Sequence, residues 1–298
     1  MRVIPLASES LGVRSLATFV EAGGIKILVD PGVALGPKRY GLPPAKVEIE
    51  TLHRMRRKLQ GYAKRADVIT ISHYHYDHHT PFFEGLYESS SEEYAREIHE
   101  GKLLFIKHPR ENINFSQKKR AWAFLKRAEP IARGIEFADG RSFDLGDVAL
   151  EFSPAVPHGS EGSKLGFVVM VMIDDGFRLI HASDIQLLNR KAVEWIIEKV
   201  PDLLITGGPP TYLGKRAEGS WKTGIKNLNE IIRETNAEVV LDHHIVRDKR
   251  YREFFDELEK SPKTFAGFLN VEDRPLEAYR RELHKIERGE EEEVPFLI

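Results

Sequence analysis

Short apolar runs recur along the chain, and polar or turn-forming residues follow most of them. Such runs, bounded by turn residues, predict buried strands. Adjacent glycines at 23–24, and an Asp-Gly pair at 175–176, each separate two runs and predict hairpins. The remaining runs predict single strands, at residues 68–71, 103–106, 202–206 and 238–241, with two or three short strands between residues 134 and 152.

Apolar residues at helical spacing occupy the segments between the strands. They predict helices over residues 44–64, 92–99, 116–133 with Ser116 as N-cap, 191–200, and onward from Ser220 as N-cap. Charged helical patterns then run from residue 251 to 286. Because no internal repeat or long linker is present, we expect a single domain over residues 1–298, with a helical C-terminal extension from about 250 to 298.

The composition narrows the class of protein. The chain has 298 residues, of which 41% are hydrophobic and 30% charged, values typical of soluble globular proteins. No apolar run approaches the roughly 20 residues that span a bilayer, and no signal-peptide core is present, so we expect no membrane association and a cytoplasmic location. The absence of cysteine excludes disulfides and thiolate metal sites. Together with the abundant Glu, Lys and Arg, it resembles a protein from a hot environment.

Candidate metal ligands gather directly after the predicted strand 68–71, where four histidines and an aspartate lie within Ser72-His73-Tyr74-His75-Tyr76-Asp77-His78-His79. Imidazole and carboxylate groups are the ligands that Zn²⁺ and similar divalent ions prefer. A histidine-rich surface loop is the alternative, but buried unpaired imidazoles are costly, so the segment predicts a metal site. Other candidates also follow predicted strands, namely His158, Asp184, His243 and His244. Taken alone, His158 would be structural and Asp184 a helix cap.

The sequence His73-x-His75-x-Asp77-His78 resembles the second motif of the metallo-β-lactamase-fold hydrolase superfamily. The resemblance implies a four-layer αββα sandwich. It implies one ion held by His73, His75 and His158, a second held by Asp77, His78 and His243 or His244, and Asp184 bridging the two. Asp30, which ends a predicted strand, would orient a ligand or cap its own turn. Neighbouring strand residues face opposite sides, so His243 and His244 are not expected to be equivalent, and the spacing to Arg247 favours His243.

The resemblance further implies a dinuclear metal-dependent hydrolase. Two divalent ions, with Zn as the first candidate and Mn or Fe as alternatives, would generate a bridging hydroxide that attacks a phosphodiester or an ester or lactone bond. Asp77 would orient the nucleophile, and His79, Tyr212 or Lys215 would stabilise charge or protonate the leaving group. Alternatively His79, and likewise His181, would contact a ligand or alter the metal preference. A metal-stabilised binding protein without catalysis, and a di-iron redox protein, are the other hypotheses.

The substrate is less well defined by the sequence. A small-molecule ester or phosphodiester fits the net charge of −2, which gives no overall attraction to nucleic acid. RNA has weaker support, from the basic segment 107–126 and the His243 to Arg247 spacing. An ordinary charged helix is the favoured interpretation of that segment. The nearest likeness is a largely archaeal branch of the superfamily, which indicates no substrate. The sequence does not indicate the oligomeric state. We expect the other histidines to be solvated, namely His53, His99, His108 and His284.

Overall fold

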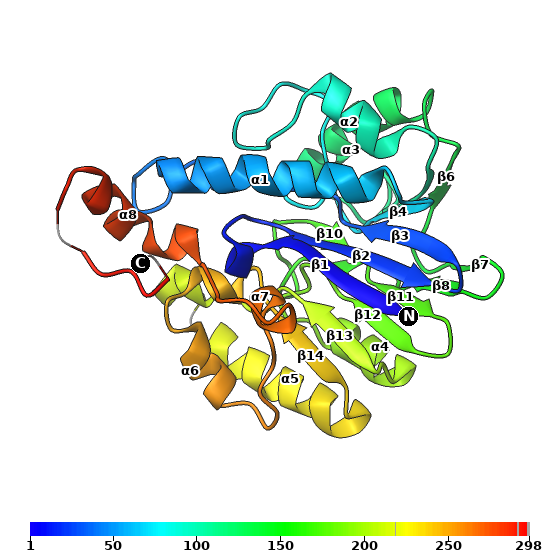
Figure 1. Cartoon of the computed structure of the whole chain (residues 1–298). Helices are drawn as coiled ribbons and strands as arrows, with labels where there is room; N and C mark the ends of the chain where they lie inside the picture. Colours follow the sequence, from blue (N-terminus) through cyan, green and yellow to red (C-terminus); the bar gives the residue numbers. More distant parts are fainter. Residues whose placement is uncertain (218, 291, 297–298) are drawn as a thin grey trace.

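Two sheets lie face to face in the computed structural model, and helices cover the outer face of each (Figure 1). The structure describes residues 1–217, 219–290 and 292–296. Each of the two main sheets has six strands. The predicted αββα sandwich is therefore confirmed.

The first sheet runs in the order β1-β2-β3-β4-β5-β6. Its strands β1, β2 and β3 pair antiparallel, and β3 to β6 pair parallel. The bounds are β1 (Arg2–Ser8), β2 (Leu16–Ala22), β3 (Ile25–Val29), β4 (Val68–Ile71), β5 (Leu103–Ile106) and β6 (Gly134–Phe137). Because β3 and β4 are parallel neighbours, the loops that follow them leave the same edge of the sheet.

The second sheet runs in the order β14-β13-β12-β11-β8-β7, with β12, β13 and β14 parallel and the rest antiparallel. A separate two-stranded ribbon pairs β9 with β10. The bounds are β7 (Ser142–Asp144), β8 (Ala149–Phe152), β9 (Val156–Pro157), β10 (Phe167–Val168), β11 (Val171–Asp174), β12 (Arg178–His181), β13 (Leu203–Thr206) and β14 (Glu238–Leu241).

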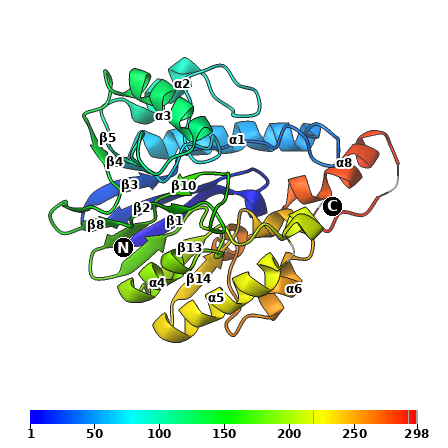
Figure 2. The ribbon, with the colours of Figure 1, turned by 180° about the vertical axis from the view of Figure 1, so that it is seen from behind.

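The helices divide between the two outer faces. Figure 1 and the reverse view in Figure 2 place α1, α2 and α3 against the first sheet, and α4, α5 and α6 against the second. Their bounds are α1 (Lys46–Ala63), α2 (Glu92–His99), α3 (Phe115–Ala128), α4 (Arg190–Lys199), α5 (Ser220–Thr235), α6 (Tyr251–Asp256), α7 (Phe265–Phe268) and α8 (Arg280–Glu287). Short 3-10 helices are η1 (Glu9–Leu11), η2 (Thr211–Ala217), η3 (Ile245–Arg247) and η4 (Leu276–Tyr279). None of the described helices is long and apolar enough to cross a membrane.

Strand alternation explains how the layers pack. On β3, Leu28 points to the cluster beneath α1, α2 and α3, while Ile27 points to the cluster between the sheets. Ile69 and Val68 on β4 alternate in the same way. Both faces of the sheet are therefore apolar, which is why these strands read as continuous apolar runs.

Two predicted helix starts differ from the structure. Asn114, and not Ser116, is the N-cap of α3, where its side chain accepts a hydrogen bond from Gln117 N at 2.7 Å. Gly219, in the left-handed conformation, precedes α5, so Ser220 is the first helical residue instead of its cap. Both polar residues lie one or two positions inside the helix, where sequence pattern alone does not fix the boundary.

One predicted solvated histidine is buried. His99 is 0% exposed, and its ring lies against Phe82 and Phe124 beneath α3.

The C-terminal segment contains a buried ion pair. Arg280 of α8 donates a hydrogen bond to Glu48 of α1 at 2.7 Å, and both side chains are 0% exposed. The extension that we expected from about residue 250 therefore contacts the first layer of helices.

Candidate metal centre

Loops from both sheets bring the candidate ligands to one place. The 73–79 loop follows β4 in the first sheet, Asp184 follows β12, and His243 follows β14 in the second. His158 follows the short strand β9. In the part of the chain that the structure describes, these residues form groups whose ligand atoms lie within 4.8 Å of one another, as expected for a shared metal centre.

One group consists of three imidazoles and a carboxylate, from His73, His75, His158 and Asp184. Asp184 Oδ2 lies 2.9 Å from His158 Nε2 and 3.6 Å from His73 Nε2. His73 Nδ1 donates to Ser72 Oγ at 2.9 Å, which leaves its Nε2 free to face the group. This is the set that the resemblance assigned to the first ion.

A second group consists of Asp77, His78 and His243. His243 Nε2 lies 3.3 Å from His78 Nε2 and 3.7 Å from Asp77 Oδ2. Asp184 lies beside this group too, with Oδ1 at 3.3 Å from His243 Nε2 and Oδ2 at 3.2 Å from His78 Nε2. One carboxylate thus contacts both groups, the position expected of a bridging ligand.

His243 and His244 both face Asp184, contrary to the expectation that they would point to opposite sides. That expectation required a strand, but β14 ends at Leu241 and His243 adopts a left-handed conformation with φ of 58°. Its ring and that of His244 are 4.4 Å apart, and His244 Nε2 lies 3.6 Å from Asp184 Oδ2. Which of the two would ligate stays a prediction.

Asp30 fixes the position of the candidate ligands that follow the first sheet. Its Oδ2 accepts hydrogen bonds from His78 Nδ1 at 2.9 Å and Ser72 Oγ at 2.6 Å, and its Oδ1 accepts from Ser72 N at 2.8 Å. Burial alone would raise the pKa of Asp30, but the bonded His78 lowers it. Such a carboxylate fixes the orientation and tautomer of a ligating imidazole. Of the two roles considered for Asp30, the geometry fits orientation of His78.

Glu9 makes the corresponding contact on the other side, and the sequence analysis missed it. Glu9 Oε2 accepts from His243 Nδ1 at 2.7 Å, and Oε1 accepts from Arg247 Nε at 2.6 Å. The side chain is 3% exposed and follows β1 at the very start of the chain. A single acidic residue separated by 234 positions from its partner gives no local signal that could have identified it.

The two potential ligand groups differ in the ionisation of their histidines. Burial lowers the pKa of His73 well below its usual value and that of His75 to about 3. Burial alone would raise the pKa of Asp184, but the surrounding histidines, His244 first, hold it well below its usual range. Burial opposes the charged ring of His243, yet the carboxylates of Glu9 and Asp184 raise its pKa to about 9. Neutral imidazoles and ionised carboxylates are the forms that bind metals, so the group with His73 and His75 is ready for a cation. His78 and His243, whose pKa values are raised, must each release a proton when an ion binds.

Buried polar atoms without a hydrogen-bond partner indicate whether a metal ion would fit the centre. Among the described residues, His73 Nε2 and Asp184 Oδ1 are buried without a hydrogen-bond partner. Leaving such groups unsatisfied is costly, and each belongs to a group of potential ligands. Nitrogen and oxygen donors of this kind fit Zn²⁺ or a related divalent ion. The cluster could therefore hold metal, and its donors fit the ion that the sequence predicts.

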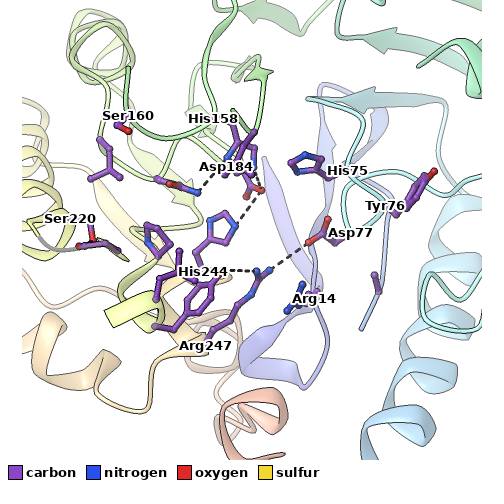
Figure 3. A pocket seen from close by; sticks show the side chains of 18 of the residues that line it. Arg14, His75, Tyr76, Asp77, His158, Ser160, Asp184, Ser220, His244 and Arg247 are labelled. Atoms are coloured by element: carbon purple, nitrogen blue, oxygen red, sulfur yellow. Dashed lines mark hydrogen bonds and ion pairs between the residues drawn. The ribbon is translucent and has the colours of Figure 1, made fainter. Parts of the chain in front are cut away.

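The centre opens into a cavity of about 950 Å³. Figure 3 shows His75, Asp77, Asp184 and His244 directed into it. The Arg247 guanidinium lies 3.5 Å from the Asp77 carboxylate. Tyr212 also lines this cavity, and its hydroxyl lies 3.4 Å from Arg247 Nη1. A substrate in the cavity would therefore lie beside the candidate ligands.

The structure places two further predicted site residues outside these groups. His79 Nδ1 donates to the His75 carbonyl at 2.9 Å, and its ring lies against Tyr74 and Phe124 and borders a neighbouring, smaller cavity. His181 Nε2 donates to the Leu16 carbonyl at 2.9 Å. Neither imidazole belongs to the potential ligand groups found among the described residues.

Relatives of high identity span the whole chain. A UPF0282 protein of Thermococcus gammatolerans is 88% identical over 299 residues, covering 100% of both chains. A UPF0282 protein of Methanocaldococcus jannaschii is 48% identical, covering 95% of this chain and 96% of its own. The relatives come from thermophilic archaea, in agreement with the composition. Among solved structures, a diphosphatase from the PhnP family matches with a TM-score of 0.44 and 13% identity, covering 84% of this chain and 80% of its own.

A family model supplies the assignment. The model described as the beta-lactamase superfamily domain matches residues 26–245. That range includes the 73–79 loop, His158, Asp184, His243 and His244, and it contains strands of both main sheets. The chain belongs to the beta-lactamase superfamily.

Proposed function

We propose that the protein is a dinuclear metal-dependent hydrolase that cleaves a phosphodiester or an ester or lactone bond. The observation that carries the proposal is the position of Asp184, whose carboxylate contacts both potential ligand groups at the wall of the large cavity. A carboxylate shared by two ion sites is the arrangement expected where two metals act on one substrate.

In this proposal His73, His75 and His158 hold one ion, and Asp77, His78 and His243 or His244 hold the other. Zn is the first candidate and Mn or Fe the alternatives. When bound, such a pair of divalent ions supplies a nucleophile from water near neutral pH and stabilises developing negative charge. Asp30 and Glu9 would fix the rings of His78 and His243, since each accepts a hydrogen bond from the Nδ1 atom.

Other residues of the cavity have roles in the same proposal. Asp77 would orient the attacking water as well as ligate, because it lines the cavity and its carboxylate is held near Arg247. Burial alone would raise the pKa of Asp77, but His78, His243 and Arg247 lower it, so it remains ionised. Tyr212 would donate a proton or a hydrogen bond to the leaving group. His79 would act as a positioning residue, through its bond to the His75 carbonyl.

Metal analysis and hydrolysis measured together test the proposal. We expect the purified protein to bind two divalent ions per chain and to hydrolyse at least one substrate from a panel of chromogenic phosphodiesters, esters and lactones. The Asp184→Ala variant should lose hydrolysis by about 100-fold or more, since it removes the group that contacts both ion sites. Asp147→Ala, at an exposed position, is the matched control and should behave like the wild type.

The same experiment separates the hydrolase from a metal-stabilised binding protein. Two bound ions without turnover on any substrate of the panel would refute the hydrolase and support the binding protein. Unchanged hydrolysis by Asp184→Ala would refute the assigned role of that carboxylate. Circular dichroism of each variant shows whether a loss of activity reflects unfolding.

A further inference from the structure

Helix α3 exposes an unusual combination of aromatic and basic side chains. Phe115 is 85% exposed and Trp122 is 65% exposed. The same exposed face carries Lys118, Lys119, Lys126 and Arg127, and the helix contains no acidic residue. We refer to these six residues as the α3 face. Large apolar side chains are rarely left in water beside a concentration of like charge, so the face suggests contact with a ligand.

The α3 face continues into the candidate metal centre through a series of hollows. The large cavity shares Tyr76 and Arg120 with a second cavity of about 250 Å³. That second cavity shares Trp122 and Lys126 with a third of about 670 Å³ on the other side of the helix. Each boundary between hollows therefore consists of one aromatic and one basic residue.

Cations and rings are in direct contact along this path. The Arg120 guanidinium lies 4.4 Å from the centre of the Tyr76 ring, and Lys126 Nζ lies 5.4 Å from the Trp122 ring. Within the described residues, Arg127 is the one cation of the α3 face with an ion-pair partner, Glu92 at 3.3 Å. Glu111 and Glu129 line the third hollow, whereas no carboxylate lines the second. The remaining lysines are available to an anion.

We propose that the α3 face and these hollows bind single-stranded nucleic acid and lead it toward the metal centre. The second part rests on the proposed hydrolase function, for which it selects phosphodiesters as substrates. Proteins that bind single strands combine basic grooves that follow the phosphates with aromatic side chains on which bases stack. Trp122 would supply the stacking surface, and Lys118 and Lys126 would contact phosphates.

Two other occupants fit the surface less well. In a symmetric dimer through α3, the same lysines would oppose one another across the interface, and like charges repel. An anionic membrane would also attract the helix. A lipid surface, however, does not require a path of hollows from the helix to the metal centre. A single-stranded nucleic acid carries both phosphates and bases that stack, so it would contact the basic and the aromatic side chains along the whole path.

The test is binding of a fluorescein-labelled oligouridylate of about 12 nucleotides, a length within the usual site sizes, followed by fluorescence anisotropy. We expect Trp122→Ala to weaken binding about fivefold or more, because stacking on an aromatic side chain contributes at least this much per base. The double variant Lys118→Gln/Lys126→Gln should make the slope of log affinity against log salt shallower by about 1.4, since each lost phosphate contact contributes about 0.7. Both variants should keep small-substrate hydrolysis, because neither changes the metal centre.

A matched control uses two exposed lysines of α5, Lys222→Gln/Lys226→Gln, which should leave both affinity and salt slope unchanged. Equal binding to duplex RNA with no effect of Trp122→Ala would overturn the inference. So would a dimer that Trp122→Ala dissociates, or Trp122-dependent binding to phosphatidylglycerol-phosphatidylcholine vesicles without oligonucleotide binding. If the wild type fails to bind the oligonucleotide but hydrolyses small substrates, this inference falls and the proposed function stands.

Discussion

Glu9 offers the sharpest test of how the centre is held. Its carboxylate accepts hydrogen bonds from His243 Nδ1 at 2.7 Å and from Arg247 Nε at 2.6 Å, and it is 3% exposed. Glu9→Gln keeps the size of the side chain but removes its charge. One amide oxygen cannot fully replace two carboxylate oxygens that each accept from a different donor.

Two effects of different size are expected. Loss of a carboxylate that orients a ligating histidine typically weakens metal binding 10–100-fold, or about 1.4–2.7 kcal/mol. Arg247, which is 4% exposed, also loses its closest carboxylate. A buried charge left without its partner destabilises a protein by about 3–5 kcal/mol. The loss of metal affinity should be confined to the ion at His243, because His73, His75 and His158 do not contact Glu9.

Metal-buffered titration followed by mass spectrometry measures the first effect. At free metal-ion concentrations near the wild-type Kd, we expect Glu9→Gln to retain one tightly bound ion and to lose the other. Urea unfolding measures the second effect, as a lower free energy of unfolding. Glu21→Gln on β2, whose carboxylate pairs with the more exposed Arg65 at 2.6 Å, is the matched control and should change neither.

Three outcomes would refute this reasoning. Two ions bound as tightly by Glu9→Gln as by the wild type would show either that Glu9 does not position His243 or that His244, and not His243, is the ligand. Equal weakening at both ions would indicate a general loosening of the fold, since only one group contacts Glu9. An unchanged free energy of unfolding would show that Arg247 finds another partner, for which Asp77 at 3.5 Å is the nearest carboxylate.

Three further predictions concern stability. Removing metal with a chelator should lower the melting temperature and added Zn²⁺ should restore it, because an ion at 1,000 times its Kd stabilises the folded state by about 4 kcal/mol; an unchanged melting curve would count against resident metal. Burial alone would raise the pKa of Glu277, but Arg14, bonded to it at 2.6 Å, lowers it to about 2. The resulting stability of about 3 kcal/mol should be present above pH 4.5 and lost as the pH falls toward 2, so wild type and Glu277→Gln should differ in urea unfolding at pH 7 and converge at low pH. In Gly32→Ala the new Cβ would lie 2.5 Å from His79 N, so we expect about 1–3 kcal/mol of destabilisation and reduced metal content. Gly61→Ala on α1, which has open space around its Cβ position and no left-handed conformation, should keep both stability and metal.

Much of the fold follows from local sequence pattern. Apolar runs bounded by turn residues identify β4, β5, β13 and β14, because strands buried on both faces need apolar residues at successive positions. Candidate ligands directly after β4, β12 and β14 then predict a centre at one edge of the sandwich. The motif at 73–78 carries the family resemblance, and the family model confirms it.

Other features depend on contacts that no local pattern encodes. Glu9 begins η1 directly after β1, and its role depends on a contact with His243, which is 234 positions away. The orientation of His243 and His244 depends on a left-handed residue just past β14, where the strand rule that we applied no longer holds. His99 reads as an exposed helical histidine, but α3 covers it through Phe124. Sequence spacing does not reveal such packing of one layer on another.

The position of the metal centre between the two sheets explains why some site residues could be predicted from the sequence and others could not. Apolar residues fill most of the interface between the sheets, but at this edge polar groups replace them. Ser72 from the first sheet and Ser183 from the second are 2.8 Å apart at their Oγ atoms, and both contact Asp30. The distance between the two ligand groups is therefore set by how the sheets pack and not by one loop. A metal ion that binds ligands from both sheets would hold this edge together, so metal content and stability should change in parallel in every variant that shifts one sheet against the other.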